Sequence, residues 1–287
     1  MKTFNSFLFS ITILFSLSSC NRYIAVQKTY DPEIMPGKKP CKILLVNIFD
    51  YTSSAYVKET DKNTYRTGVI KLAEGLTSSF AKDESFRFIM GDTLKKNIIP
   101  GQLTVILPKD SIITSCKRQE ADMLLTLDSL NIFFDWETII NNEDKNNLLK
   151  EKNFYLHTRF YLSFYSATGD LINRSMIEEN SLYKSRMALS GLITFKPPVS
   201  KAIGIVESLS FQAGQDYVTK FYPRTVMESR QLYTGKAFKE CDLFIKLRNW
   251  DKVTELLDEL AKSPDPDIAV KARHNLSVIK ELAVAGN

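Results

Sequence analysis

The chain has 287 residues, of which 44% are hydrophobic and 11% aromatic, so it can bury the core of one large domain or two small ones. Its formal net charge of +5 comes from charges of both signs that are interspersed, without a block of five like charges. This pattern argues against a nucleic-acid-binding protein and against a polybasic membrane patch.

The first 20 residues have the pattern of a signal peptide for lipidation. Lys2 precedes an apolar stretch over residues 7–17, and a Ser-Ser-Cys sequence ends at Cys20. This apolar stretch is well short of the roughly 20 residues that a membrane-spanning helix needs. The segment resembles the lipobox of bacterial lipoproteins, which implies cleavage after Ser19 and a diacylglycerol on the Cys20 sulfur. An ordinary secretory signal is the alternative.

Lipidation would fix where the protein resides. With residues 1–19 removed, two or three acyl chains such as palmitate on Cys20 would anchor the chain stably to a membrane surface. Asn21 follows the cysteine, and in the resembling lipoproteins this favours the outer membrane, with the protein facing the periplasm. Residues 20–40 contain three prolines and no helical period, which predicts a lipidated, flexible tether.

Residues 41–233 are predicted to form an α/β domain. A nearly continuous apolar run over 42–49 predicts a buried strand, a helical period over 67–81 predicts a helix, and 86–90 predicts a second strand. This β-α-β order favours a parallel pair of strands. The remaining predicted elements are a helix over 108–118, a strand over 121–134, a hairpin of strands 155–165 and 171–183, a helix over 197–222 and a strand over 226–233.

The order of these elements resembles periplasmic lipoprotein domains of the TolB amino-terminal and CsgG type. The resemblance covers residues 41–222 and is carried by four features: a first strand that ends near Phe49, a helix with Leu72 and Leu76, a long strand that starts at Ala121, and a Thr-Gly-Asp turn in the hairpin. It implies a mixed sheet flanked by helices. It also implies a role in assembly, scaffolding or secretion instead of hydrolysis.

Residues 234–287 are predicted to form a short helical segment that resembles a tetratricopeptide repeat. Amphipathic stretches follow one another, and the pair from residue 249 onward has about the length of one repeat. Because a repeat buries its apolar face only against a neighbour, one unit must pack on the α/β domain or expose a face to a partner. A plain helical hairpin is the alternative. Candidate partner contacts are Trp250, His274 and Asn275.

The sequence predicts no catalytic, cofactor or metal site. Neither a CxxC nor an HExxH pattern is present, and His157 and His274 are the two histidines of the chain. Asp135 and Glu137 flank an indole and would be the acid and the nucleophile of an enzyme that cleaves glycans. A solvated strand end is the other interpretation of this pair.

Two sets of residues concern modification in the cell envelope. Three Asp-Ser/Thr-apolar triplets match an acceptor pattern for protein O-glycosylation, with candidate acceptors at Thr93, Ser111 and Ser129. The cysteines other than Cys20 are interpreted as buried free thiols, and a disulfide among them stays open: Cys41, Cys116 and Cys241.

Together these observations predict a membrane-anchored periplasmic lipoprotein that acts as a protein-binding or assembly module of the cell envelope. We expect a membrane, through the lipid, and an envelope protein as its partners, with no nucleic acid, no catalysis and no cofactor. Whether the protein also binds a small-molecule ligand stays open. An envelope enzyme acting on glycans and a structural envelope protein are the alternatives.

Overall fold

The computed structural model describes residues 21–37, 39–52, 57–91, 107–139, 149–189 and 195–285. The chain divides into two compact units: unit 1 combines residues 1–31 with 223–287, and unit 2 spans 32–222. The predicted signal peptide and Cys20 lie outside the described residues. None of the helices within the described ranges is both long enough and apolar enough to cross a membrane.

Unit 2 is built on a five-stranded mixed sheet with the order β3-β2-β4-β5-β6. Strand β2 runs parallel to β3, as the predicted β-α-β order favoured, and it also runs parallel to β4. The pairs β4–β5 and β5–β6 are antiparallel. Strands β5 and β6 form the predicted hairpin but are longer than predicted. The strands are β2 (Cys41–Asn47), β3 (Phe86–Met90), β4 (Met123–Ile139), β5 (Leu149–Ser166) and β6 (Leu171–Leu189).

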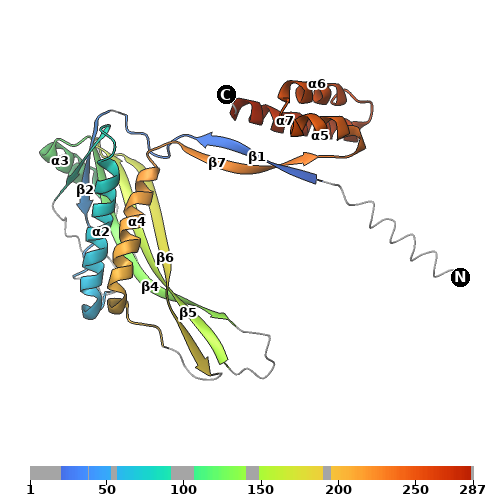
Figure 1. Ribbon diagram of the computed structural model, residues 1–287. Coiled ribbons are helices and arrows are strands. Elements are labelled where there is room, and N and C mark those ends of the chain that lie inside the picture. Colours follow the sequence, from blue (N-terminus) through green and yellow to red (C-terminus); the bar gives the residue numbers. More distant parts are fainter. Residues whose placement is uncertain are drawn as a thin grey trace. The chain divides into compact units, whose positions relative to one another are not determined.

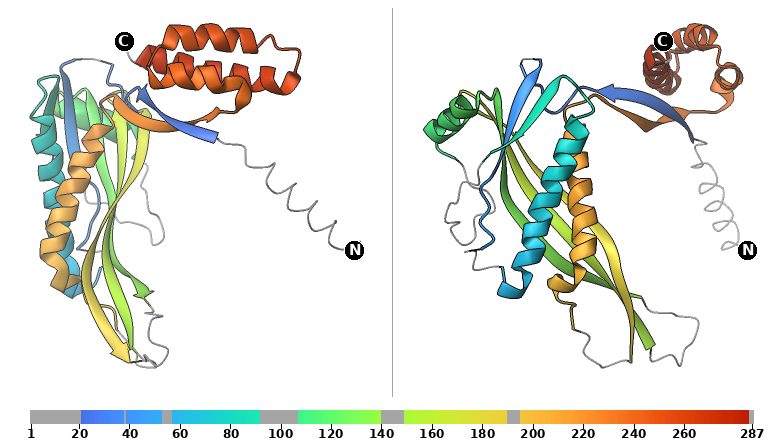
Figure 2. Two further views of the ribbon diagram at one scale, coloured as in Figure 1. Left: turned by 45° about the vertical axis from the view of Figure 1, so that its right-hand side comes forward. Right: turned by 60° about the vertical axis from the view of Figure 1, so that its left-hand side comes forward.

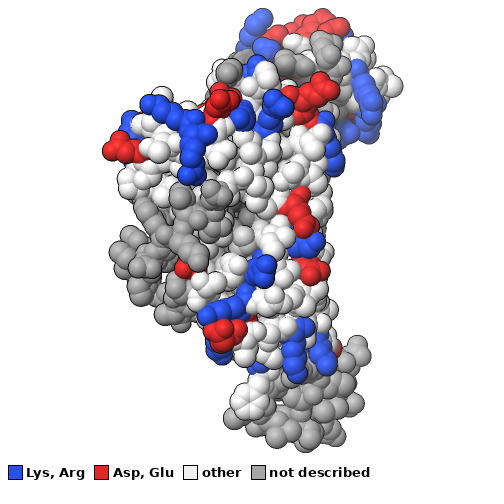
Figure 3. All heavy atoms as spheres, turned by 90° about the vertical axis from the view of Figure 1, so that its left-hand side faces the viewer, with Lys and Arg blue, Asp and Glu red and all other residues white. Residues whose placement is uncertain are grey.

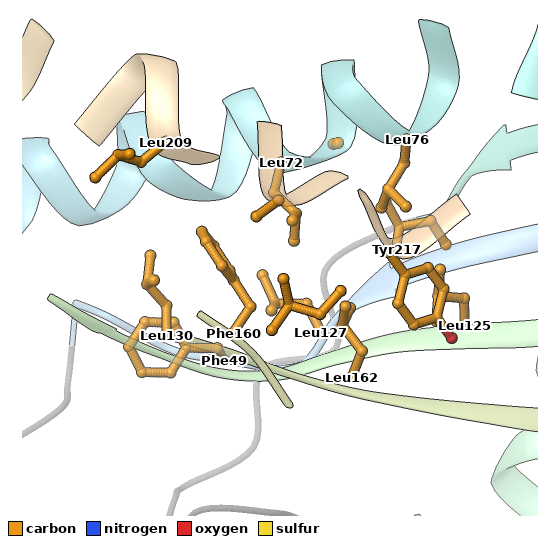
Figure 4. Close-up of a cluster of buried hydrophobic side chains, with 14 of the residues drawn as sticks. Phe49, Leu72, Leu76, Leu125, Leu127, Leu130, Phe160, Leu162, Leu209 and Tyr217 are labelled. Atoms are coloured by element: carbon orange, nitrogen blue, oxygen red, sulfur yellow. The ribbon is translucent and has the colours of Figure 1, made fainter. Parts of the chain in front are cut away.

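Helices cover both faces of this sheet. Two of them lie side by side across one face (Figures 1 and 2): α2 (Lys62–Phe80) and α4 (Ile203–Thr219). Between them and the sheet lies the larger core, which contains Leu72 and Leu76 of α2 and Phe160 and Leu162 of β5 (Figure 4). The opposite face is covered by α3 (Lys109–Gln119), which packs on β2 and the start of β4. Two short 3-10 helices, Glu59–Asp61 and Val199–Ala202, precede α2 and α4.

The contact between α2 and α4 is close because glycines meet there. A Cβ atom added to Gly75 would lie 2.1 Å from the carbonyl oxygen of Phe211, and one added to Gly214 would lie 2.4 Å from that of Leu72. Any side chain at these two positions would push the helices apart. The two ends of unit 2 are also held together, since the Ile34 amide donates to the Lys220 carbonyl at 3.0 Å.

Unit 1 consists of a two-stranded antiparallel ribbon and three helices. The ribbon pairs β1 (Asn21–Tyr30) with β7 (Arg224–Tyr233). Its core joins Val26 and Leu232 of the ribbon to buried residues of all three helices. The helices follow the short 3-10 helix Lys236–Phe238 and are α5 (Lys239–Lys246), α6 (Trp250–Leu260) and α7 (Pro266–Ala285).

Two predictions about organisation are wrong. Residues 21–30 were expected to belong to a flexible tether over 20–40, but they form β1, because β7 supplies pairing partners that lie 194 to 212 residues further along the chain. For the same reason the strand predicted at 226–233 does not close the α/β domain predicted over 41–233. It belongs with the helical segment predicted over 234–287. The three helices of unit 1 therefore bury their apolar sides on this ribbon, an arrangement that the sequence did not suggest.

The three described cysteines are buried thiols that form no disulfide with one another, as the simpler interpretation predicted. Burial raises the pKa of the Cys241 thiol to about 11 and raises that of Cys116 as well. Acidic and basic side chains are interspersed on the face that Figure 3 presents, in keeping with the sequence pattern.

Candidate partner-binding groove

The ribbon of unit 1 has one buried and one exposed face. Side chains alternate along β1: Ile24 and Val26 point toward the helices, whereas Tyr23, Ala25 and Gln27 are exposed. The opposite strand follows the same alternation, with buried Leu232 on the side that faces the helices. The ribbon therefore lies on the helices with one face and leaves the other face uncovered by described residues.

Hydrogen bonds at the end of β7 reveal which edge of the ribbon is free. The Tyr233 amide donates to the Asn275 side chain at 2.8 Å, and its carbonyl accepts from the same side chain at 2.7 Å. The Tyr233 backbone therefore points away from β1. In an antiparallel pair the direction alternates, so Tyr23, Ala25, Gln27 and Thr29 of β1 aim their amides and carbonyls away from β7. The described residues supply no backbone partner on that edge.

Two grooves lie along this free edge of β1, and Gln27 lines both. The first has a volume of about 550 Å³ and is bordered by β1, the end of α5 and the start of α6. The second, of about 720 Å³, is bordered by residues 26–29 and α7. The side chains of the first groove are Arg22, Ile24, Ala25, Gln27, Met227, Ile245, Lys246, Arg248, Trp250 and Leu282, and α7 contributes Ser277, Lys280 and Glu281 to the second.

The three predicted partner contacts have different positions in unit 1. Trp250 is the first residue of α6 and lines the first groove. His274 is exposed on α7, and its Nε2 atom lies 2.9 Å from the carbonyl oxygen of Gln231. Asn275 is only 2% exposed and is fully used by the Tyr233 backbone. Its predicted contact with a partner is therefore wrong: Asn275 fastens α7 to β7.

In unit 2, the carboxylates considered for glycan cleavage do not face a site. Asp135 and Glu137 are both exposed near the end of β4, and neither lines the cavities described for this chain. The indole between them, Trp136, is 45% exposed and lies under the Lys196 ammonium, 4.3 Å from its ring centre. This geometry fits the solvated strand end.

A polar cluster on the neighbouring strands holds His157. Its Nδ1 atom lies 2.8 Å from the Glu178 carboxylate, which also accepts a hydrogen bond from Arg159 at 2.7 Å. Burial raises the pKa of Glu178, but these two bonds outweigh it and leave the pKa below its ordinary value. The ring of Phe133 stacks on His157, with centres 5.0 Å apart. Since every member has a partner, the cluster links β4, β5 and β6.

A buried carboxyl group lies beside a bulge in β4. The hydroxyls of Ser163 and Thr126 donate to Asp128 at 2.5 and 2.6 Å, and the Arg174 side chain donates to Ser163 at 3.2 Å. Burial raises the pKa of Asp128 to about 6, against the lowering effects of Ser163, Thr126 and Arg174. The group has no access to a described cavity, so we assign it a structural role.

The predicted modification sites stay predictions. Cys20 and Thr93 lie outside the described residues. Ser111 is half-buried in the first turn of α3, and Ser129 is half-buried on β4, directly after buried Asp128.

A further cavity of about 210 Å³ lies at the carboxyl ends of β2 and β3, where open α/β sheets commonly bind ligands. Arg66, Asn47 and Tyr51 are its polar lining, beside apolar residues of α2. Two segments that come after these strands in the chain, 53–56 and 92–106, lie outside the described residues.

The sequence pointed to Trp250 but missed the edge of β1, which is the main feature of the groove. The sequence signal was weak, because Ala25 separates Ile24 from Val26, and Arg22 and Lys28 share their side of the strand. Prolines at 32, 36 and 40 favoured an unpaired interpretation of the whole stretch.

Comparisons with known proteins give a family and no activity. A family model described as "Domain of unknown function (DUF8603)" matches residues 45–233. No curated protein matches the chain.

Two solved structures are similar over much of their length. One is described as "putative neuraminyllactose-binding hemagglutinin homolog from Helicobacter pylori", with 14% identity, 67% of this chain and 90% of that chain covered, and a TM-score of 0.30. The other is the hypothetical protein CT253 from Chlamydia trachomatis, with 11% identity, 63% and 97% covered, and a TM-score of 0.27. Scores this low establish neither a shared fold nor a shared ligand.

Proposed function

Because the chain belongs to the DUF8603 family, whose description names no activity, we propose from its own residues that it is a lipid-anchored protein-binding or assembly module of the cell envelope. In this proposal Cys20 carries the lipid, the protein faces the periplasm from the outer membrane, and unit 1 holds the partner. The resemblance to TolB amino-terminal and CsgG-type domains supports an assembly role.

The free edge of β1 carries this proposal. An unpaired strand edge binds extended segments of other proteins by adding them as a further strand, with main-chain hydrogen bonds for affinity and side-chain pockets for specificity. The outward backbone groups of Ala25 and Gln27 supply the bonds, and the two grooves supply the pockets. Proteins usually protect such edges, so an edge that lies open beside two grooves favours a binding role.

The helices fit the same role. We propose that α6 and α7 are a degenerate tetratricopeptide-like unit whose inner face rests on the ribbon, while Trp250 at its start borders the first groove. Repeat units of this kind commonly present surfaces to other proteins.

The lipid is tested by intact mass spectrometry of the protein extracted from its membranes. The expected mass is that of a chain starting at an acylated Cys20, with any glycan on Thr93, Ser111 or Ser129 visible in the same spectrum. An unmodified amino terminus at any other residue would overturn the anchor.

The groove is tested by cross-linking in living cells. A photoreactive benzoylphenylalanine in place of Gln27 should yield one reproducible protein adduct, whereas the same group in place of Asp258, which is exposed on α6, should not. Equal adducts from both positions would indicate random contact.

Two proline variants make this test specific for strand addition. In Ala25→Pro the ring replaces an outward N–H on the β1 edge and leaves the ladder with β7 intact. Ser229→Pro is the matched control, because Ser229 lies opposite Ala25 and its N–H points to the other edge of the ribbon. The adduct should disappear with Ala25→Pro and persist with Ser229→Pro. An adduct that survives Ala25→Pro refutes binding along β1.

A further inference from the structure

The short helix α5 exposes two leucines. Its inner side places Cys241 and Ile245 in the core of unit 1. On the outer side, Leu243 is 54% exposed, and Leu247, the residue that caps the helix, is 65% exposed. Neither leucine is needed for the core, and together they form an apolar strip on a helix of only eight residues.

Basic residues frame this strip. Lys239 and Lys246 are exposed and stand four residues before and three residues after Leu243, so they share its side of the helix. Arg248 follows in the left-handed region with φ 55° and is also exposed. Among the described residues, Lys246 and Arg248 form no ion pair. Cations at a helix carboxyl end offset the helix dipole, but that effect does not account for the exposed leucines.

This strip lies near the point where the chain leaves Cys20. The guanidinium of Arg22 is 3.7 Å from the Asp242 carboxylate of α5. Arg22 is two residues from Cys20, so its Cα lies within roughly 7 Å of the Cα that would carry the lipid. No tether separates the two, since β1 starts at Asn21. An acyl anchor on Cys20 would therefore hold α5 at the membrane surface.

We propose that the outer side of α5, formed by Lys239, Leu243, Lys246, Leu247 and Arg248, binds the anionic headgroup region of the membrane in which Cys20 is anchored. This inference rests on the lipid anchor of the proposed function. Apolar side chains with flanking cations are the composition of helices that lie in the membrane interface. The charge suits anionic phospholipid, and the position beside the anchor brings the surface to the lipid.

The test uses vesicles and the chain from residue 21 onward, which contains every described element and no lipid. Its partition into phosphatidylcholine vesicles with about one-third phosphatidylglycerol is compared with that into pure phosphatidylcholine. A cation near an anionic surface contributes about fivefold in partition. Lys246→Gln with Arg248→Gln should therefore weaken binding by about 25-fold, and Leu247→Ser by about tenfold.

The matched control removes the same charges elsewhere in unit 1. Lys262, just after α6, and Arg273, on α7, are exposed and do not belong to α5, and Lys262→Gln with Arg273→Gln should change partition by less than about threefold. An equal loss in the control would mean attraction by net charge alone, and equal binding to both kinds of vesicle would also overturn the proposal. A protein partner at this surface would give no vesicle binding at all. Lys246 and Arg248 also line the first groove, so Leu247→Ser, at a residue outside that lining, is the variant that tests the strip alone. The lipid is decided by the mass of the extracted protein, and partner binding is decided by the cross-link.

Discussion

Replacing Asp128 by asparagine should stabilise unit 2 at neutral pH and leave its stability unchanged at low pH. The carboxyl is buried, with a pKa of about 6 in the folded protein against an ordinary value of 3.8. In the unfolded chain it ionises near its ordinary value, so between pH 4 and 6 the folded state holds the proton more tightly. Asp128 therefore lowers the free energy of unfolding of unit 2 progressively as the pH rises from 4 to 6, and it has no such effect at lower pH.

The magnitude follows from the shift. About two pKa units at about 1.4 kcal/mol each make the ionised Asp128 cost about 3 kcal/mol above pH 6. The pKa of about 6 already includes the hydrogen bonds from Ser163 and Thr126, and the amide oxygen of asparagine can accept them as the protonated carboxyl does. The variant should thus gain about 3 kcal/mol at pH 8 and about nothing at pH 4.

The two tryptophans make the assay possible, because Trp136 lies in unit 2 and Trp250 in unit 1. In a Trp250→Phe background, urea denaturation followed by fluorescence reports on unit 2 alone. Comparing Asp128 and its asparagine variant at each pH cancels other groups that titrate in this range, such as Glu179, whose burial beside Asp216 raises its pKa to about 7. A difference that stays constant from pH 4 to 8 would refute the assignment of the shift to Asp128.

Three further outcomes test the packing. Gly214→Ala should lower the free energy of unfolding of unit 2 by about 3 kcal/mol, because the new Cβ atom would collide with the backbone of α2. In the control Gly204→Ala, the new Cβ atom has no neighbour within 4 Å, so the free energy of unfolding should rise by up to about 1 kcal/mol. A mild effect of Gly214→Ala in the same urea assay would contradict the close helix contact. Asn275→Ala should destabilise unit 1 by about 2 kcal/mol, seen by Trp250 fluorescence in a Trp136→Phe background, because it leaves the Tyr233 amide without its partner. A fully stable variant would argue against that bond. Finally, a thiol reagent at pH 8 should label none of Cys41, Cys116 and Cys241 in the native chain from residue 21, and all three in urea. The number of labels is counted by mass spectrometry. Rapid labelling of the native chain would show that the thiols are not buried.

The sequence predicted the elements of unit 2 well, because their patterns are local. The apolar run at 42–49, the helical period of α2 and the Thr-Gly-Asp turn each require only neighbouring residues. The close approach of Gly75 and Gly214 could not be predicted, since an isolated glycine in a helical pattern does not indicate which helix it meets.

The groove was less predictable because it depends on contacts between segments that are far apart in the sequence. A strand such as β1 is stable only when paired, and its partner lies on the far side of unit 2 in the sequence. Trp250 could be singled out as a large aromatic residue at a helix start. That it borders an open strand edge depends on a contact between chain segments about 200 residues apart.

The position of unit 2 between β1 and β7 also dictates an order of folding. Closing a loop of this length costs about 3 kcal/mol more entropy than closing a loop of a few residues. If unit 2 folds first, the bond from Ile34 to Lys220 holds its two ends together, and β1 and β7 then meet almost as a local hairpin. We therefore expect unit 1 to assemble last, so that the partner groove exists only on molecules whose central unit has already reached its native state.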